Sequence, residues 1–354
     1  MKNEIDIEEE NKDIVRRYKA LLRSCNSEIT REDKKLIRKA FNLAVDAHKD
    51  VRRKSGEPYI FHPIAVAQIV AKDIGLDATS IACALLHDVV EDSDYTLTDI
   101  EKAFNPKIKK IINGLTKISG FSEQDISSQA ENFRKMLLTI SDDVRVILIK
   151  LADRLHNMQT LDSMPRLKQQ KIGSETLYIY APLAHRLGLY SIKTELEDLG
   201  LKYTEPEIYK DIARQLNETK KARIQYIQRF TKPLKKSLKE HKLSFSIKGR
   251  PKSIFSIRKK MKNQGVTFDQ VYDKFAIRII LNSELKNEKP DCWETYSVIT
   301  DHFRPNPDRL RDWISTPKAN GYESLHTTVM GPGGKWVEVQ IRTERMDEIA
   351  EKGY

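Results

Sequence analysis

Two histidines and two aspartates in the first 160 residues are of the types that bind a divalent transition metal. His87 and Asp88 close the apolar run IACALLHDVVED, His62 stands upstream of them, and Asp153 follows downstream in KLADRLHNMQTL. Imidazole nitrogens and carboxylate oxygens form a ligand set for such an ion. An adjacent histidine and aspartate on an apolar helix are costly to bury without a cation. The four residues together therefore indicate a metal site.

Each of these residues also has an ordinary structural explanation, which is the stronger one when the residue is taken alone. His62 could cap a helix, and His87 could be a hydrogen-bonded histidine of the core. Asp153 could pair with the neighbouring Arg154. Only the combination favours metal binding.

The C-terminal half contains a second group of candidate functional residues, which consists of two acids and many cations. Asp273 stands at the entry to the segment FAIRIIL, and Glu338 lies in the alternating segment VEVQIRT. If these strands are neighbours, the two carboxylates could share a Mg²⁺, which phosphoryl-type transfer requires. Two acids on two strands are a weak signal by themselves. The surrounding cations are Arg250, Lys252, Arg258, Lys259, Lys260, Arg278, Arg309, Arg311, Lys318 and His326.

Most of these cations are expected to form a solvated surface, and we keep that interpretation for Arg258 and Lys259. Arg250 and Lys252 differ because they flank Pro251, where a predicted strand meets a predicted helix. Side chains and helix N–H groups can converge on a phosphate at such a junction.

Composition limits the class of protein. The chain has 354 residues, 39% of them hydrophobic and 32% charged, which suits two or three globular domains. The 3 cysteines lack disulfide-type spacing, which favours a reducing, cytoplasmic location. No apolar run approaches the roughly 20 residues of a membrane span, and the acidic N-terminus is unlike a signal peptide. The net charge of +11 suggests a polyanionic partner, although from composition alone a solvated basic surface is the stronger explanation.

Helical periodicity dominates the first two thirds of the chain, residues 5–242. Asp142 and Asp143 open a helix, and we expect Asp153, Asn157 and Thr160 to share one of its faces. A polar loop is predicted over 118–132, and charged helices over 165–240 join two larger parts. The buried stripe of the helix after Asp143 is predicted to contain Val144, Ile147, Leu148, Leu151, Leu155 and Met158.

Strand signals begin at about residue 243. Strands are predicted over 244–250, 275–281 and 337–343, with a helix over 251–264 that has Pro251 in its first turn. In the last strand Val337, Val339 and Ile341 take one face, and the polar residues between them take the other. The second part is therefore α+β, with an antiparallel or mixed sheet.

Several motifs of the chain resemble the RelA/SpoT homologue family, the long enzymes that make and destroy the alarmones (p)ppGpp. The first half contributes RRKSGEPYIFHP, CALLHDVVEDSDYT, LIKLADRLHNMQTL and YAPLAHRLGLYSIKTELEDLGLKY, and the second half GRPKSIFSIRKKM, VYDKFAIRI, TPKANGYESLHTTVMGPGG and VEVQIRT. The resemblance covers roughly residues 30–354. It implies an all-α HD-type hydrolase domain (1–165), a connecting helical bundle (166–240) and an α+β nucleotidyltransferase-like synthetase domain with a mixed sheet (241–354).

In the first half, the resemblance implies removal of the 3′-pyrophosphate of (p)ppGpp. A Mn²⁺ ion lowers the pKa of a bound water in such a site. The implied residues are His62, His87, Asp88 and Asp153 for the metal, Glu91 and Asp92 for the attacking water and its protons, and Arg53, Lys54, Asn157 and Thr160 for the nucleotide.

In the second half, the resemblance implies transfer of pyrophosphate from ATP to the 3′-OH of GDP or GTP. Asp273 would bind Mg²⁺, and Glu338 would help to hold it or act as a base. Tyr322 would stack on guanine, although without the resemblance it fits a turn residue after Gly321 better. The other implied nucleotide-binding residues are Arg250, Lys252, Lys260, Arg278, Arg311, Asn320 and His326.

The chain departs from the family pattern at three places. Gln159 replaces an arginine, Arg311 stands where lysine is frequent, and residues 262–270 match no signature of substrate preference. Two other functions stay open: a hydrolase with a degenerate synthetase module, and a basic RNA-binding protein. The 165–240 helices could couple the two sites. Ribosome and tRNA contacts are expected only through C-terminal regulatory domains, which the chain lacks.

Overall fold

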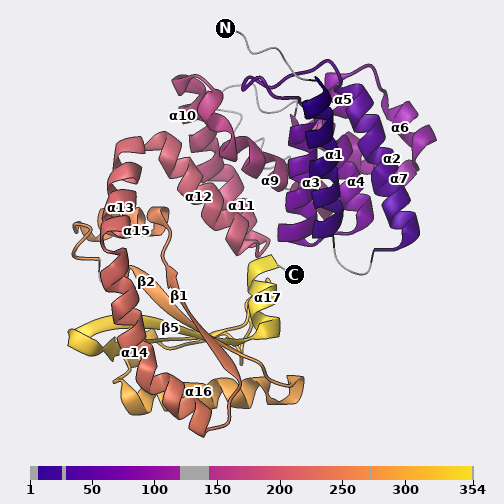
Figure 1. Ribbon diagram of the computed structural model, residues 1–354. Helices are drawn as coiled ribbons and strands as arrows, with labels where there is room; N and C mark the ends of the chain where they lie inside the picture. Colours follow the sequence, from indigo (N-terminus) through magenta and orange to yellow (C-terminus); the bar gives the residue numbers. More distant parts are fainter. Residues whose placement is uncertain (1–6, 26–28, 120–142, 272, 353–354) are drawn as a thin grey trace. The chain divides into compact units, whose positions relative to one another are not determined.

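The computed structural model describes residues 7–25, 29–119, 143–271 and 273–352. The chain divides into two compact units, residues 1–172 and 173–354 (Figure 1). Residues 120–132 of the predicted polar loop lie outside the described residues. The segment 166–240 that was expected to connect two domains contributes a boundary helix, and the rest of it belongs to the second unit.

The described part of the first unit is entirely helical, as the periodicity predicts. Two of its helices, α3 and α4, are buried along almost their whole length. α4 packs against both α2 and α3, and α3 packs against α9. The helices are α1 (Ile7–Ser24), α2 (Arg31–Ala47), α3 (Phe61–Ile69), α4 (Ala78–Leu86), α5 (Val89–Asp92), α6 (Leu97–Ala103), α7 (Pro106–Ser119), α9 (Val144–Gln159) and α10 (Arg166–Glu175).

Helix α9 begins where the sequence predicts, and the side chain of Asp143 caps it by accepting a hydrogen bond from the N–H of Arg145. Val144 was wrongly placed in the buried stripe: it is 42% exposed, because the first residue of this helix lies outside the packed part. Leu148 is only partly buried. The buried apolar residues of α9 are Val146, Ile147, Ile149, Leu151, Ala152, Leu155 and Met158.

The second unit combines helices with one five-stranded mixed sheet. The strand order is β1-β2-β5-β4-β3, in which β2 and β5 are parallel and the other neighbouring pairs are antiparallel. The helices are α11 (Ala181–Arg186), α12 (Tyr190–Thr204), α13 (Pro206–Glu218), α14 (Lys220–Glu240), α15 (Ile254–Gln264), α16 (Glu288–His302) and α17 (Glu344–Lys352), and the strands are β1 (Phe245–Pro251), β2 (Phe275–Leu281), β3 (Arg311–Asp312), β4 (Leu325–Gly331) and β5 (Lys335–Thr343).

The two faces of the sheet differ in character. One face carries apolar residues of β2, β4 and β5, which form a core with α14 and α16. Phe230 of α14 stacks on Phe303 with ring centroids 4.4 Å apart inside this core. The opposite face presents the alternate residues of the same strands, among them Arg278, His326, Glu338 and Gln340. An all-α unit followed by an α+β unit with a mixed sheet confirms the predicted fold class.

The position of Pro251 differs from the prediction. Pro251 is the last residue of β1, where it pairs with Phe275, and α15 begins at Ile254 with Ser253 as its cap. The N–H of Lys252 still donates to the carbonyl of Lys274, so the strand pairing continues past the proline. A proline suits this place because it ends an edge strand.

Candidate functional sites

Three helices of the first unit bring together a buried group of metal-ligand type. Ligand atoms of His62, His87 and Asp153 all lie within 4.8 Å of one another, and all three residues are buried. They come from α3, from the C-terminal end of α4 and from α9. Asp88 adjoins the group, with its Oδ2 3.1 Å from Nε2 of His87 and 3.5 Å from Nε2 of His62. The structure thus brings together all four predicted ligands.

The hydrogen bonding of His87 fits a bound cation. Its Nδ1 lies 2.8 Å from the carbonyl of Ala84, so a ring that donates from Nδ1 and gives up its Nε2 proton in exchange for a cation would present a lone pair at Nε2. That Nε2 is buried and has no hydrogen-bond partner in the described part of the chain, although Oδ2 of Asp88 lies 3.1 Å from it. Two nitrogens and two carboxylates suit Mn²⁺, Fe²⁺ or Zn²⁺. The donor set therefore fits a divalent transition metal without selecting one.

The charges inside the group are strongly coupled. Burial lowers the pKa of His87, but the carboxylates of Asp88 and Asp153 outweigh it and raise that pKa to about 10. Burial raises the pKa of Asp153, but Lys150, with Nζ 2.9 Å away, and the two histidines hold it well below its ordinary value. The acids are therefore ionised at neutral pH, as ligands must be.

Three aromatic residues that the sequence did not point to surround the metal-type group. The hydroxyl of Tyr59 donates to Oδ2 of Asp88 at 2.7 Å. His156 approaches His62, with the two Nδ1 atoms 2.8 Å apart. His48 is 1% exposed, packs on the Tyr59 ring at 4.8 Å, and has no hydrogen-bond partner for either ring nitrogen within the described residues. A buried polar residue of this kind is visible only after the helices are packed.

The predicted nucleotide-binding residues of this unit lie around Arg53. Its guanidinium donates to Oγ1 of Thr160 at 3.0 Å and to Oδ1 of Asn157 at 3.4 Å. Asn157 in turn donates to Oδ1 of Asp153 at 2.6 Å, which links this group to the metal-type residues. Lys54 is exposed, without a hydrogen bond or ion pair among the described residues.

The two acids predicted to handle the attacking water both lie on the short helix α5. Burial and the negative charge of Asp88 raise the pKa of Asp92. Glu91 is exposed on the same helix. The charge of Asp88 therefore acts on Asp92.

Lys252 bridges the two acids of the second unit. Nζ of Lys252 lies 2.8 Å from Oδ2 of Asp273 and 2.7 Å from Oε2 of Glu338. Lys260 also contacts Asp273. Burial raises the pKa of Asp273 and of Glu338, but Lys252 outweighs burial and lowers both. The two carboxylates thus converge on one ammonium group, as the predicted strand adjacency requires.

The register of the sheet places the predicted polar residues in rows. Gln340 of β5 stands opposite Arg278 of β2 and His326 of β4, and His326 stands opposite Arg311 of β3. Arg311 is exposed, and its guanidinium donates to the carbonyls of Asp308 and Leu310. Arg311 is therefore turned toward its own loop, apart from the other predicted residues.

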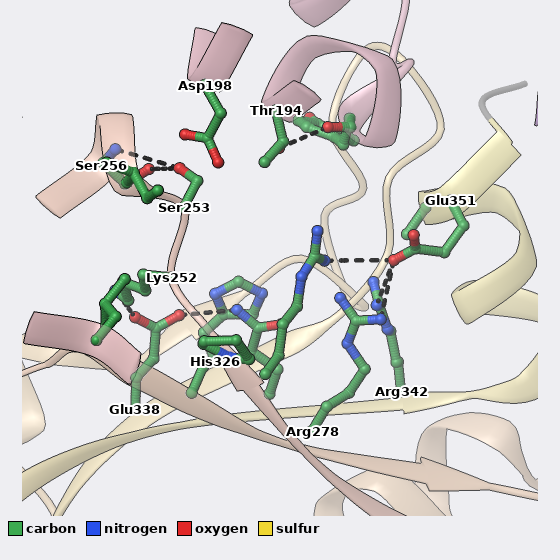
Figure 2. A pocket seen from close by; sticks show the side chains of 18 of the residues that line it. Thr194, Asp198, Lys252, Ser253, Ser256, Arg278, His326, Glu338, Arg342 and Glu351 are labelled. Atoms are coloured by element: carbon green, nitrogen blue, oxygen red, sulfur yellow. Dashed lines mark hydrogen bonds and ion pairs between the residues drawn. The ribbon is translucent and has the colours of Figure 1, made fainter. Parts of the chain in front are cut away.

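A cavity of about 770 Å³ opens over this polar face, and Figure 2 shows the side chains that line it. Tyr322 lies at its wall, where its hydroxyl is 2.8 Å from Nε2 of His326 and burial lowers the pKa of His326 to about 4. The Tyr322 ring is only 9% exposed and meets the ring of Tyr190 at 5.3 Å. Asn320 donates to the hydroxyl of Tyr190 at 3.0 Å.

Glu351 of α17 forms ion pairs with three arginines beside the cavity (Figure 2). Oε1 of Glu351 lies 2.9 Å from Arg278, 3.3 Å from Arg250 and 3.5 Å from Arg342. Arg342 is 1% exposed and also pairs with Asp347 at 2.6 Å. Arg342 and Glu351 were not predicted, because alternation alone makes Arg342 another surface cation.

Comparison with known proteins assigns a class to each half of the chain. The family model described as "HD domain" matches residues 40–190, and the model described as "Region found in RelA / SpoT proteins" matches residues 249–354. The buried His62–His87–Asp153 group lies in the first match, and the Asp273–Lys252–Glu338 group lies in the second. An HD domain followed by a RelA/SpoT region therefore defines the protein.

Curated relatives share this arrangement over nearly the whole chain. A "GTP pyrophosphokinase" of Myxococcus xanthus is 45% identical over 91% of this chain and 42% of its own length. The "Bifunctional (p)ppGpp synthase/hydrolase SpoT" of Escherichia coli is 43% identical over 90% of this chain and 45% of its own length. The chain belongs to the RelA/SpoT family, which confirms the resemblance, and it spans less than half the length of these relatives.

No helix in the described residues is long and apolar enough to cross a membrane.

Proposed function

We propose that the first unit hydrolyses the 3′-pyrophosphate of (p)ppGpp, giving GDP or GTP and pyrophosphate. The observation that carries this proposal is the buried His62–His87–Asp153 group, with Asp88 beside it, inside an HD domain. A divalent ion held there, Mn²⁺ in this proposal, would lower the pKa of a bound water and supply a nucleophile for phosphorus.

The chain's own residues would orient the substrate and move protons in this reaction. Arg53 carries positive charge to the pyrophosphate, and its hydrogen bonds to Asn157 and Thr160 hold the guanidinium in place. Lys54 adds a second, exposed cation. Asp92, whose pKa is raised by burial and by Asp88, would accept the proton of the attacking water, and Glu91 would assist it.

We also propose that the second unit transfers pyrophosphate from ATP to the 3′-OH of GDP or GTP, with Mg²⁺ held by Asp273 and Glu338. Lys252 and Lys260 already lie against these acids, so they are placed to neutralise the ATP phosphates. Arg250, Lys252 and Arg278 all line one cavity, which favours a nucleotide substrate over a long RNA.

The acceptor nucleotide would occupy the side of the cavity near Tyr322. Tyr322 would face the guanine, and His326 and Asn320 lie beside it. Arg311 is turned away in this structure, so its part in binding would require its side chain to rotate.

Two substitutions test the assignment of one reaction to each unit. We expect Asp88→Ala to abolish hydrolysis of ppGpp with Mn²⁺ and to spare synthesis from ATP and GDP with Mg²⁺. Asp273→Ala should do the reverse. Nucleotide chromatography of both reactions measures the outcome. Equal loss of both activities in each variant contradicts the two-site proposal, and a wild-type chain that only hydrolyses supports the hydrolase-only alternative.

A further inference from the structure

Helix α12 presents one polar face to the cavity of the second unit. Tyr190, Thr194 and Asp198 line the cavity and lie at spacings of four residues, which places them on one side of the helix. Figure 2 shows Thr194 and Asp198 across the cavity from Glu338 and Lys252. The sequence motif that contains them was assigned only a connecting role. Its residues are therefore part of the cavity wall.

The C-terminal half of α12 holds the helix that follows Lys252. Oδ1 of Asp198 accepts a hydrogen bond from the N–H of Phe255 at 2.8 Å, in the first turn of α15. A carboxylate at the N-terminal end of a helix accepts from an otherwise unpaired amide and interacts favourably with the positive end of the helix dipole. Glu205, just after α12, fastens the same helix through Arg258 at 2.7 Å. These contacts hold α15 in place, and Lys252 lies just before this helix.

These contacts also change how the donor phosphates can be bound. The N–H of Phe255 is taken by Asp198, and the N–H of Ser256 is taken by Oγ of Ser253 at 3.2 Å. The start of α15 therefore offers fewer free amides to a phosphate than the sequence suggested. The lysine side chains, Lys252 and Lys260, must provide the positive charge, so their placement by α15 matters more.

The N-terminal end of α12 holds the loop before β4. The hydroxyl of Tyr190 accepts from Nδ2 of Asn320 at 3.0 Å, and Oδ1 of Asn320 faces the N–H of Tyr322 at 3.4 Å. The Tyr190 ring meets the Tyr322 ring edge-on at 5.3 Å. Gly188 packs against Asn320 with a φ of +79°, a conformation that favours glycine. The loop is thus tied to α12 by a hydrogen bond and by ring packing.

We propose that α12 is a positioning helix of the transfer site, in which Asp198 places the donor-side lysines and Tyr190 places the acceptor-side loop. One rigid helix then sets the spacing between the two nucleotides. In-line transfer is sensitive to such spacing, because the reacting atoms must be held about 3–3.5 Å apart. This inference rests on the proposed synthetase function of the second unit.

Substitutions at the two ends of α12 should raise the KM values of different substrates. Asp198→Ala should raise the KM for ATP about tenfold and leave the KM for GDP within about twofold. Asp198→Asn should restore most of the ATP affinity, because an amide oxygen accepts the same N–H. Tyr190→Phe should raise the KM for GDP about fivefold with little change for ATP. Ser191→Ala, on the exposed side of α12, is the matched control.

Amide hydrogen exchange provides a readout that does not depend on catalysis. The Phe255 amide should exchange faster in Asp198→Ala than in the wild type, and at the wild-type rate in Tyr190→Phe. If the wild-type chain makes no (p)ppGpp while this exchange pattern appears, the synthetase function is wrong, although Asp198 still holds the first turn of α15. If exchange is unchanged, or if both KM values rise equally in both variants, the positioning role is overturned.

Discussion

Replacing Tyr59 by phenylalanine should weaken metal binding to the first unit. The change removes one hydroxyl, which donates to Oδ2 of Asp88 at 2.7 Å, and keeps the ring that packs against His48 and His62. A hydrogen bond to an ionised carboxylate contributes about 1.5–3 kcal/mol. Loss of a partner that orients a metal ligand typically costs about 10–100-fold in affinity, or roughly 1.4–2.7 kcal/mol. The two figures agree, so we expect a 10–100-fold loss of Mn²⁺ affinity.

Thermal unfolding of metal-stripped protein at increasing Mn²⁺ concentration measures this effect. Because a ligand stabilises the folded state according to its concentration relative to Kd, the Tyr59→Phe curve should move to about 10–100-fold higher Mn²⁺. Tyr95→Phe is the control, since its hydroxyl donates to Oδ2 of Asp46 at 2.8 Å on an exposed surface of the same unit. Superimposable titrations of Tyr59→Phe and the wild type would refute the reasoning.

Two further predictions concern buried charge. His48 is neutral when folded because burial lowers its pKa from 6.5 to about 4, whereas the unfolded chain takes up a proton below 6.5. The free energy of unfolding should therefore fall as the pH drops from 6.5 toward 4, by up to about 1.4 kcal/mol per pH unit. Urea unfolding at pH 7 and pH 5 measures this fall, which should be smaller in His48→Phe than in the wild type. Lys252→Met leaves Asp273 and Glu338 without their shared cation, so the rate of synthesis should fall roughly a hundredfold or more while hydrolysis is retained. Nucleotide chromatography of both reactions measures the two rates. An equal loss of both activities would contradict the prediction.

The metal-type residues could be found from the sequence because their chemistry is unusual for their surroundings. A histidine and an aspartate at the end of an apolar helix are costly to bury, and the helical period placed Asp153 and Asn157 on one face, where they form a hydrogen bond. Tyr59 and His48 could not be found in the same way. Their roles depend on packing between helices, and a tyrosine and a histidine in such segments are ordinary core residues.

Strand signals in the sequence identified β1, β2 and β5 but not β3 and β4. Period-two alternation placed Glu338 on a polar face, and the parallel pairing of β2 and β5 then brought Glu338 beside Ala276, close to Asp273. Alternation could not reveal that Arg342, on that same face, is buried against α17. It also could not reveal the direction of the Arg311 side chain, which local carbonyl groups decide.

The acids of the two sites contact different side chains, and this difference affects the stage at which each site would bind a metal ion. Asp88 and Asp153 meet histidine nitrogens, which can exchange a proton for a metal ion without moving. Asp273 and Glu338 instead meet Lys252, whose ammonium group has no lone pair and must move aside before an ion can bridge the carboxylates. In the proposed transfer reaction the nucleotide phosphates would attract that lysine, so Mg²⁺ would enter the second site together with the nucleotide. The first site has its metal ligands assembled without substrate.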